Sequence, residues 1–169
     1  MKEKKIEIAY RIYAIDELDA ADSELMQAAI EATRRSYAPY SNFHVGAAVR
    51  LADGTIVTGN NQENVAYPSG LCAERTALFY AHSQYPEVAV KALAIAARHA
   101  DGTPHQGIIT PCGACRQVMM ESEKRSGMPM RILLCGEKEV YVMESVKDLL
   151  PLSFEEYKLK TKLYDIQRN

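Results

Sequence analysis

The chain has 169 residues, 47% of them hydrophobic, which is the size and composition of one folded domain with a core of its own. A net charge of −2 provides no basic surface for a phosphate backbone, so the composition argues against nucleic acid as a partner and favours a small molecule. No apolar run has the length of a signal peptide or a membrane span, and we therefore expect a cytoplasmic protein.

The first predicted element is a strand-like arm over residues 4–14, in which every second residue is apolar (Ile6, Ile8, Tyr10 and Ile12). Such an arm can add to the edge of a sheet or contact another subunit. A helix follows, in which Leu25, Met26, Ala29, Ile30 and Thr33 have helical spacing. We expect Asp22 or Ser23 to cap its first turn.

Two strands over residues 45–51 and 55–59 are predicted to form a hairpin, because Asp53-Gly54 between them is a strong turn signal. Helical spacing then extends from Cys72 to His82. Since Pro68-Ser69-Gly70 interrupts regular structure just before it, Cys72 is expected near the start of this helix.

The second half of the chain predicts a buried strand, a polar loop, another helix and two more strands, over residues 92–97, 98–107, 113–123, 132–135 and 140–143. This order of elements predicts an α/β fold in which helices cover the faces of a sheet.

Neither a repeat nor a linker divides the sequence, so it indicates one main domain. We expect this domain over residues 22–156, preceded by the arm at 1–21 and followed by a polar tail at 157–169.

Three cysteines and one glutamate form the clearest chemical pattern. Cys72 is followed by Glu74, and Cys112 and Cys115 form a Cys-x-x-Cys pair that would share one face at a helix N-terminus. Helix N-termini lower the pKa of thiols and so prepare them to bind metal. Three thiolates leave the fourth position of a tetrahedral zinc ion open to water. The pattern therefore predicts a catalytic zinc site that activates water.

Three thiolates give a zinc ion a net formal charge of −1, which opposes the ionisation of bound water. Arg75 and Gln117 follow the cysteines at spacings that allow them to donate hydrogen bonds to the sulfur atoms and offset this charge. Glu74 lies two residues after Cys72 and so projects in a different direction from the ligand, which suits a proton shuttle.

The same residues allow other interpretations. A Cys-x-x-Cys pair also occurs in redox sites and structural zinc sites, with Cys72 then a core thiol. Cys135 would complete a four-cysteine site, but it follows Ile132-Leu133-Leu134 and resembles a packed hydrophobic residue. A zinc-binding scaffold without turnover, in which Glu74 is structural, also stays open. The histidines lack ligand spacing and are expected on the surface or in loops (His44, His82, His99 and His105).

Several separate motifs together resemble the cytidine deaminase family, in its three-cysteine, homotetrameric branch. The resemblance extends from residue 25 to residue 154 and implies a three-layer α/β/α fold, with a mixed sheet of roughly five strands plus the N-terminal arm. Its motifs are residues 37–48, residues 63–68 (Glu-Asn-Val-Ala-Tyr-Pro), residues 72–77 (Cys-Ala-Glu-Arg-Thr-Ala), residues 111–117 (Pro-Cys-Gly-Ala-Cys-Arg-Gln) and Leu149-Leu150-Pro151.

By this resemblance, Cys72, Cys112 and Cys115 hold one zinc ion per chain. Glu74 moves protons between the water, ring N3 and the departing amino group, while hydroxide attacks C4 of cytosine to give uridine and ammonia. The resemblance implies the same reaction on 2'-deoxycytidine, as a step of pyrimidine salvage. A relative acting on another aminated ring, such as a free base or a nucleoside antibiotic, stays an alternative.

The resemblance also implies how a nucleoside is held. Asn61 and Glu63 contact the ribose hydroxyls, Phe43 stacks near the base, and the main chain at Ala73 and Thr110 reads the pyrimidine edge. A carboxylate at the ribose repels a phosphate, which favours a nucleoside over a nucleotide. From the residues alone, Phe43 could instead belong to the core, and Asn61 and Glu63 could be turn residues that cap a strand.

In a homotetramer, the resemblance further implies that Phe154 and Tyr67 contact the site of a neighbouring subunit. Leu152-Ser153 stands where the family usually has Gly-Ala, which is a departure next to Phe154. Two other segments extend beyond the family pattern, namely the arm and the loop at 98–107. The loop precedes the helix of Cys112 and could reshape the mouth of the site or be a plain surface loop.

Overall fold

The structure is a computed structural model that describes residues 1–154. These residues form six strands and three α-helices, in the order β1 (Arg11–Ala14), α1 (Ala20–Ala32), β2 (Phe43–Leu51), β3 (Ile56–Asn60), α2 (Ala73–Gln84), β4 (Val90–His99), α3 (Gly113–Ser126), β5 (Arg131–Cys135) and β6 (Glu139–Met143). All six strands belong to one sheet of order β1-β6-β5-β4-β2-β3. β4 and β5 are parallel and the other neighbours are antiparallel, which confirms the predicted mixed sheet.

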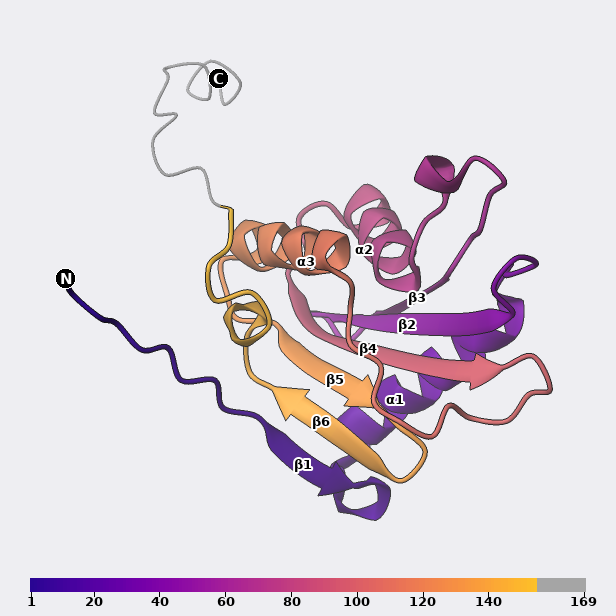
Figure 1. Ribbon diagram of the computed structural model, residues 1–169, viewed down its shortest axis with the longest axis horizontal. Coiled ribbons are helices and arrows are strands. Elements are labelled where there is room, and N and C mark those ends of the chain that lie inside the picture. Colours follow the sequence, from indigo (N-terminus) through magenta and orange to yellow (C-terminus); the bar gives the residue numbers. More distant parts are fainter. Residues whose placement is uncertain (155–169) are drawn as a thin grey trace.

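Helices cover both faces of this sheet, with α1 on one side and α2 and α3 on the other (Figure 1). Because both faces are covered, β4 is apolar along most of its length. Leu93 and Ile95 pack in the cluster under α2 and α3, while Ala94 and Ala96 face α1. The three-layer α/β/α fold expected from the sequence is confirmed.

The start of α1 differs from the prediction. The helix begins at Ala20 and is capped by Asp19, whose carboxylate accepts a hydrogen bond from the Asp22 main-chain N at 2.8 Å. Asp22 itself lies in the first turn, where it is buried and forms an ion pair with Arg131 of β5 at 2.8 Å. The expectation that Asp22 or Ser23 caps the helix is therefore wrong, because the Asp22 carboxylate is used in a tertiary contact.

The predicted arm is a strand over only part of its length. β1 pairs antiparallel with β6 at the edge of the sheet, from Arg11 opposite Val142 to Ala14 opposite Glu139. Residues 1–10 continue away from it without regular secondary structure (Figure 1). The predicted domain boundaries after residues 21 and 156 stay predictions, and the tail at 157–169 lies outside the described residues.

α2 approaches β3 so closely that Gly59 has no room for a side chain. A Cβ placed there would lie 2.4 Å from the main-chain N of Ala77 and 2.7 Å from the carbonyl O of Ala73. Replacing Gly59 by alanine is expected to lower the free energy of unfolding by about 1–3 kcal/mol, because α2 must move away from the sheet. Urea unfolding measures this change.

The matched control is Gly113→Ala, since a Cβ at Gly113 meets nothing within 4 Å and the residue begins a helix. We expect this variant to be at least as stable as the unmodified chain. Equal stability of the Gly59→Ala chain would contradict the close approach of α2 to β3.

Candidate active site

Two helix N-termini meet at one place and bring the three predicted cysteines together. Cys72 is the N-cap residue of α2, Cys112 is the N-cap residue of α3, and Cys115 lies in the first turn of α3. The Sγ atoms of Cys72 and Cys112 are 3.9 Å apart, and those of Cys112 and Cys115 are 3.5 Å apart. All three sulfur atoms lie within 4.8 Å of one another.

These distances fit a zinc ion. Thiolates at about 2.3 Å from zinc in tetrahedral geometry are about 3.8 Å from each other, close to the observed 3.5 and 3.9 Å. Cys135 takes no part, because it is packed in the core cluster between the sheet and α1, on the opposite face from α2 and α3. The structure therefore supports a three-cysteine site for one zinc ion and not a four-cysteine site.

The sulfur atoms differ in how readily they lose a proton. The pKa of Cys72 is lowered to about 5, because its thiolate accepts hydrogen bonds from Cys115 and Arg75. The pKa of Cys115 is raised, since its thiol donates to Cys72 and is buried. Cys72 is thus the first of these two to ionise, and zinc binding must release the proton that Cys115 retains.

Arg75 lies where the sequence predicts it. Its Nη2 is 3.8 Å from Cys72 Sγ and 3.4 Å from the Gly70 carbonyl O. Gln117 is oriented differently: its Nε2 donates to the Phe154 carbonyl O at 2.8 Å. The expected hydrogen bond from Gln117 to a sulfur atom stays a prediction, and Gln117 instead links α3 to the segment that ends in Phe154.

Glu74 is the second residue of α2 and is only 4% exposed. Burial raises the pKa of its carboxyl group, and the negative charge of Cys72 acts in the same direction. A buried carboxylate beside the Cys72 thiolate has a greater tendency to accept a proton than one in water. This is the property that the predicted proton shuttle requires.

A cavity of about 450 Å³ lies directly beside Cys72 and Arg75. Its other walls come from the loop before β2 and from the segment between β3 and α2 (Tyr40, Ser41, Asn61, Gln62, Glu63, Asn64, Tyr67, Gly70 and Leu71). Two of the residues predicted to bind the substrate, Asn61 and Glu63, therefore line one cavity that opens next to the metal ligands. Tyr67, which was predicted to contact a neighbouring subunit's site, lines the same cavity.

Glu63 is held by the loop before β2. Its Oε2 accepts hydrogen bonds from the main-chain N of Tyr40 at 2.9 Å and of Ser41 at 3.2 Å, and its Oε1 accepts a hydrogen bond from the Ser41 hydroxyl. These bonds lower the pKa of the Glu63 carboxyl, with the Ser41 hydroxyl as the largest cause. Ser41 was missed as a separate site residue, although it belongs to the motif at 37–48.

Both polar atoms of the Asn61 side-chain amide form hydrogen bonds with the main chain of β2. Its Oδ1 accepts from Val45 N at 2.8 Å and its Nδ2 donates to the Phe43 carbonyl O at 2.9 Å. The strand-capping role that the sequence left open is thus confirmed. One amide N–H and one oxygen lone pair stay available for a ligand.

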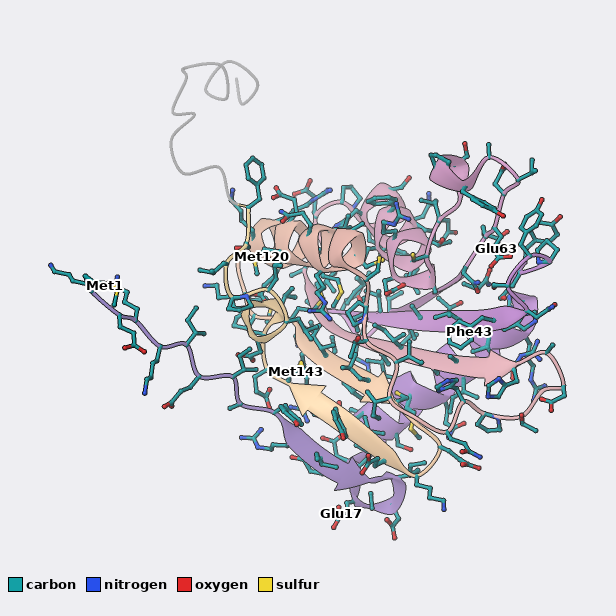
Figure 2. All side chains as sticks on the ribbon, viewed as in Figure 1. Met1, Glu17, Phe43, Glu63, Met120 and Met143 are labelled. Carbon is teal, nitrogen blue, oxygen red and sulfur yellow. The ribbon has the colours of Figure 1, made fainter. Side chains whose placement is uncertain are left out.

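Phe43 lies at the start of β2, at the same end of the molecule as Glu63 (Figure 2). Its ring packs edge-on against His105, with ring centroids 5.5 Å apart, and His105 in turn lies 5.2 Å from His99. The loop at 98–107 therefore contacts a residue predicted to stack near the base. The spacing of these histidines along the chain does not indicate this contact.

The remaining predicted residues do not all lie at this place, because Phe154 lies beside the C-terminal half of α3, away from the cysteines at the start of that helix. Ala73 is the buried first residue of α2, and Thr110 is exposed two residues before Cys112. Tyr67 and Phe154 are 75% and 85% exposed. The predicted contacts of the Ala73 and Thr110 main chain with the base, and of Tyr67 and Phe154 with a neighbouring subunit, stay predictions.

Residues 19–128 match a family model described as the cytidine and deoxycytidylate deaminase zinc-binding region. The chain belongs to this family. The matched residues include the three cysteines, Glu74, Arg75 and Gln117, so the family resemblance stated from the motifs is confirmed.

Two curated relatives in this deaminase family are close in sequence. The chain is 43% identical over 124 residues to the cytidine deaminase of Sporosarcina psychrophila, a match that covers 73% of this chain and 84% of the relative. It is 46% identical over 97 residues to the cytidine deaminase of Halalkalibacterium halodurans, covering 57% of this chain and 68% of the relative.

Solved deaminase structures have the same fold. The crystal structure of cytidine deaminase from Burkholderia pseudomallei superposes with a TM-score of 0.66 at 40% identity, covering 78% of this chain and 97% of the other. The Mycobacterium tuberculosis cytidine deaminase gives a TM-score of 0.63 at 34% identity, covering 82% and 99%. Among the described residues, no helix is both long enough and apolar enough to cross a bilayer.

Proposed function

We propose that this chain catalyses the hydrolytic deamination of cytidine and 2'-deoxycytidine to uridine and 2'-deoxyuridine, with release of ammonia. The observation that carries the proposal is the buried carboxylate of Glu74 beside three cysteine sulfurs at zinc spacing, next to an open cavity. The curated relatives and solved structures named as cytidine deaminases support the choice of substrate.

The chemistry divides between the metal and the protein. Cys72, Cys112 and Cys115 would hold the zinc ion, which would lower the pKa of a water molecule so that a nucleophile is available at neutral pH. Glu74 accepts the proton of that water, delivers it to ring N3, and moves a second proton to the amino group that leaves as ammonia. Arg75 offsets the charge of the thiolates through its contact with Cys72. The overall balance is cytidine and water to uridine and ammonia.

The protein holds the nucleoside by groups on the cavity wall. Glu63, kept ionised by its hydrogen bonds, accepts hydrogen bonds from ribose hydroxyls, and Asn61 contributes the free part of its amide. Phe43 packs near the base, and the main chain at Ala73 and Thr110 reads its edge. Because the Glu63 carboxylate repels a phosphate, a nucleoside is preferred to a nucleotide.

Ser41 is expected to act on substrate affinity through Glu63. Replacing Ser41 by alanine removes the hydroxyl that fixes the Glu63 carboxylate, and we expect the KM for cytidine to rise about tenfold with kcat within about twofold. Steady-state kinetics measures both constants.

Ser83→Ala, at an exposed position near the end of α2, is the control and should leave both constants unchanged. An unchanged KM in the Ser41→Ala variant, or a loss confined to kcat, would contradict the proposed effect of the Ser41 hydroxyl on ribose binding.

We include a homotetramer in the proposal. Tyr67 and Phe154 are exposed aromatic residues, and Tyr67 lines the cavity, so the side chains expected to complete a neighbouring site are accessible to a second subunit. Light scattering on the zinc-loaded chain measures the mass of the assembly. A role in pyrimidine salvage and a cytoplasmic location belong to the same proposal and follow from the substrate and from the sequence composition.

A substrate panel tests the proposed function against the other interpretations. We expect turnover with cytidine and 2'-deoxycytidine, and much weaker turnover with free cytosine and with cytidine monophosphate. Efficient turnover of free cytosine would contradict a role of the ribose contacts, and turnover only with a different aminated ring would replace the proposed substrate. Bound zinc without turnover of any of these compounds would favour the scaffold interpretation.

A further inference from the structure

The N-terminal arm leaves one side of an edge strand open. β1 is the outermost strand of the described sheet, with β6 on one side of it. Along residues 4–14 an apolar row is about half exposed, with Ile6 at 55%, Ile8 at 48%, Tyr10 at 49% and Ile12 at 52%. An exposed apolar edge of this kind is a template for another strand.

The position of the arm is fixed by contacts with β6 and the residue that follows it. Tyr10 stacks on Tyr141 with ring centroids 5.1 Å apart, and Arg11 Nη1 contacts Glu144 Oε1 at 2.5 Å. β6 pairs with one edge of Arg11–Ala14, so the backbone groups on the other edge point outward. The arm therefore projects from the molecule with its second edge available (Figure 1).

The arm is complementary to itself in the antiparallel direction. When two arms pair with Ala9 opposite Ala9, Glu7 of each lies opposite Arg11 of the other. The same register pairs Ile8 with Tyr10 and Ile6 with Ile12 on the other face. Each of these pairs, charged or apolar, occurs once on either side of Ala9, because the two arms are related by a twofold axis.

Neighbouring registers lack this match. With Ile8 on the axis, Lys5 lies opposite Arg11, and with Glu7 on the axis, the two Glu7 carboxylates face each other. With Tyr10 on the axis, Ala9 lies opposite Arg11 and no charge is paired. Like charges directly opposite each other destabilise a strand pair, so the charges select Ala9 as the centre.

We propose that residues 4–14 bind the same arm of a second copy of this chain, antiparallel and with Ala9 on the twofold axis, so that two sheets join into one. This contact is at the β1 edge, whereas the cavity residues follow β3 at the other edge of the sheet. It is therefore separate from the subunit contact proposed for Tyr67, and it does not depend on the proposed reaction.

Disulfide trapping tests the register. Residues directly opposite in antiparallel strands have Cα atoms about 4.5–5.5 Å apart, within the range that a disulfide spans. In the zinc-loaded full chain, Ala9→Cys is expected to give mostly cross-linked dimer under mild oxidation. The unmodified chain and the Ile8→Cys and Lys5→Cys variants should give at least fivefold less.

A second pair of variants tests the charges. In the Ala9→Cys chain, Glu7→Arg places like charges opposite each other and should lower the rate of cross-linking at least fivefold. Glu3→Arg makes the same charge change outside the paired residues and should alter the rate by less than twofold. Cytidine turnover and zinc content should be unchanged in all of these variants, which shows that they are folded.

Either of two results would overturn the proposal. One is an active Ala9→Cys chain that does not cross-link, as expected if the arm pairs with another segment of its own chain or with nothing. The other is cross-linking of Ile8→Cys or Lys5→Cys as efficient as that of Ala9→Cys, since collisions without a register or a different register would produce it.

Discussion

Replacing Glu74 by glutamine is expected to lower kcat by about 10²- to 10⁴-fold while the chain still binds one zinc ion. Glutamine has the same shape but cannot accept and return a proton. Because the Glu74 side chain is buried and its pKa is raised, the neutral amide should be tolerated without loss of the fold. Ammonia release and zinc content of the same preparation measure the two quantities.

Glu121→Gln is the matched control, since Glu121 is a glutamate on α3 with an exposed side chain. It should leave kcat unchanged. Near-normal turnover by a zinc-loaded Glu74→Gln chain would remove Glu74 from the proton-transfer role.

Replacing Cys112 by serine is expected to abolish stoichiometric zinc binding and to reduce turnover to background. Cys112 is the informative position because its side chain is exposed, whereas Cys115 is fully buried and its replacement would also disturb packing. Losing one of three thiolates lowers zinc affinity by orders of magnitude, because a serine hydroxyl is a far weaker ligand. Metal analysis after gel filtration and the unfolding temperature report zinc loading and folding.

Cys135→Ala is the control for this prediction. Cys135 is buried on the α1 side of the sheet, so the variant should keep one zinc ion per chain and most of its turnover, with some loss of stability. Retention of zinc by the Cys112→Ser chain, or its loss from the Cys135→Ala chain, would contradict the three-cysteine site.

Much of the metal site could be predicted because its geometry is local. Cys72 caps α2 since Pro68-Ser69-Gly70 interrupts the chain just before it, and Cys112 and Cys115 are held by one helix turn. The sequence therefore predicted both helix starts to within a residue. What the sequence could not predict is the close packing of α2 on β3 at Gly59, which sets the position of the start of α2 on the sheet.

The substrate cavity was less accessible to sequence reasoning, because its contacts join distant segments. Glu63 is fixed by Ser41, more than twenty residues earlier, and Phe43 contacts His105 from the loop after β4. Contacts between residues so far apart in the chain produce no periodic pattern in the sequence, so neither could be predicted from it. The interpretation of Asn61 as a residue that caps a strand was correct. Its predicted contact with the ribose stays a prediction, because the same amide can bond to β2 and still bind a ligand.

The ends of elements were predicted less well than their existence. Period-two alternation indicated a strand through Ile6 and Ile8, but regular pairing begins only at Arg11, opposite Val142 of β6. At α1, the cap is Asp19, three residues before the predicted cap at Asp22, because the Asp22 carboxylate forms an ion pair with Arg131 instead. Alternation shows which face a residue takes, and tertiary contacts decide where pairing stops.

The most direct test is to follow the conversion of cytidine to uridine by absorbance and by ammonia release, with zinc per chain measured on the same sample. We expect turnover with about one zinc ion per chain, loss of turnover on chelation, and recovery when zinc is restored. Full turnover by a chain freed of zinc, or a zinc-loaded chain that deaminates neither cytidine nor 2'-deoxycytidine, would contradict the proposed reaction.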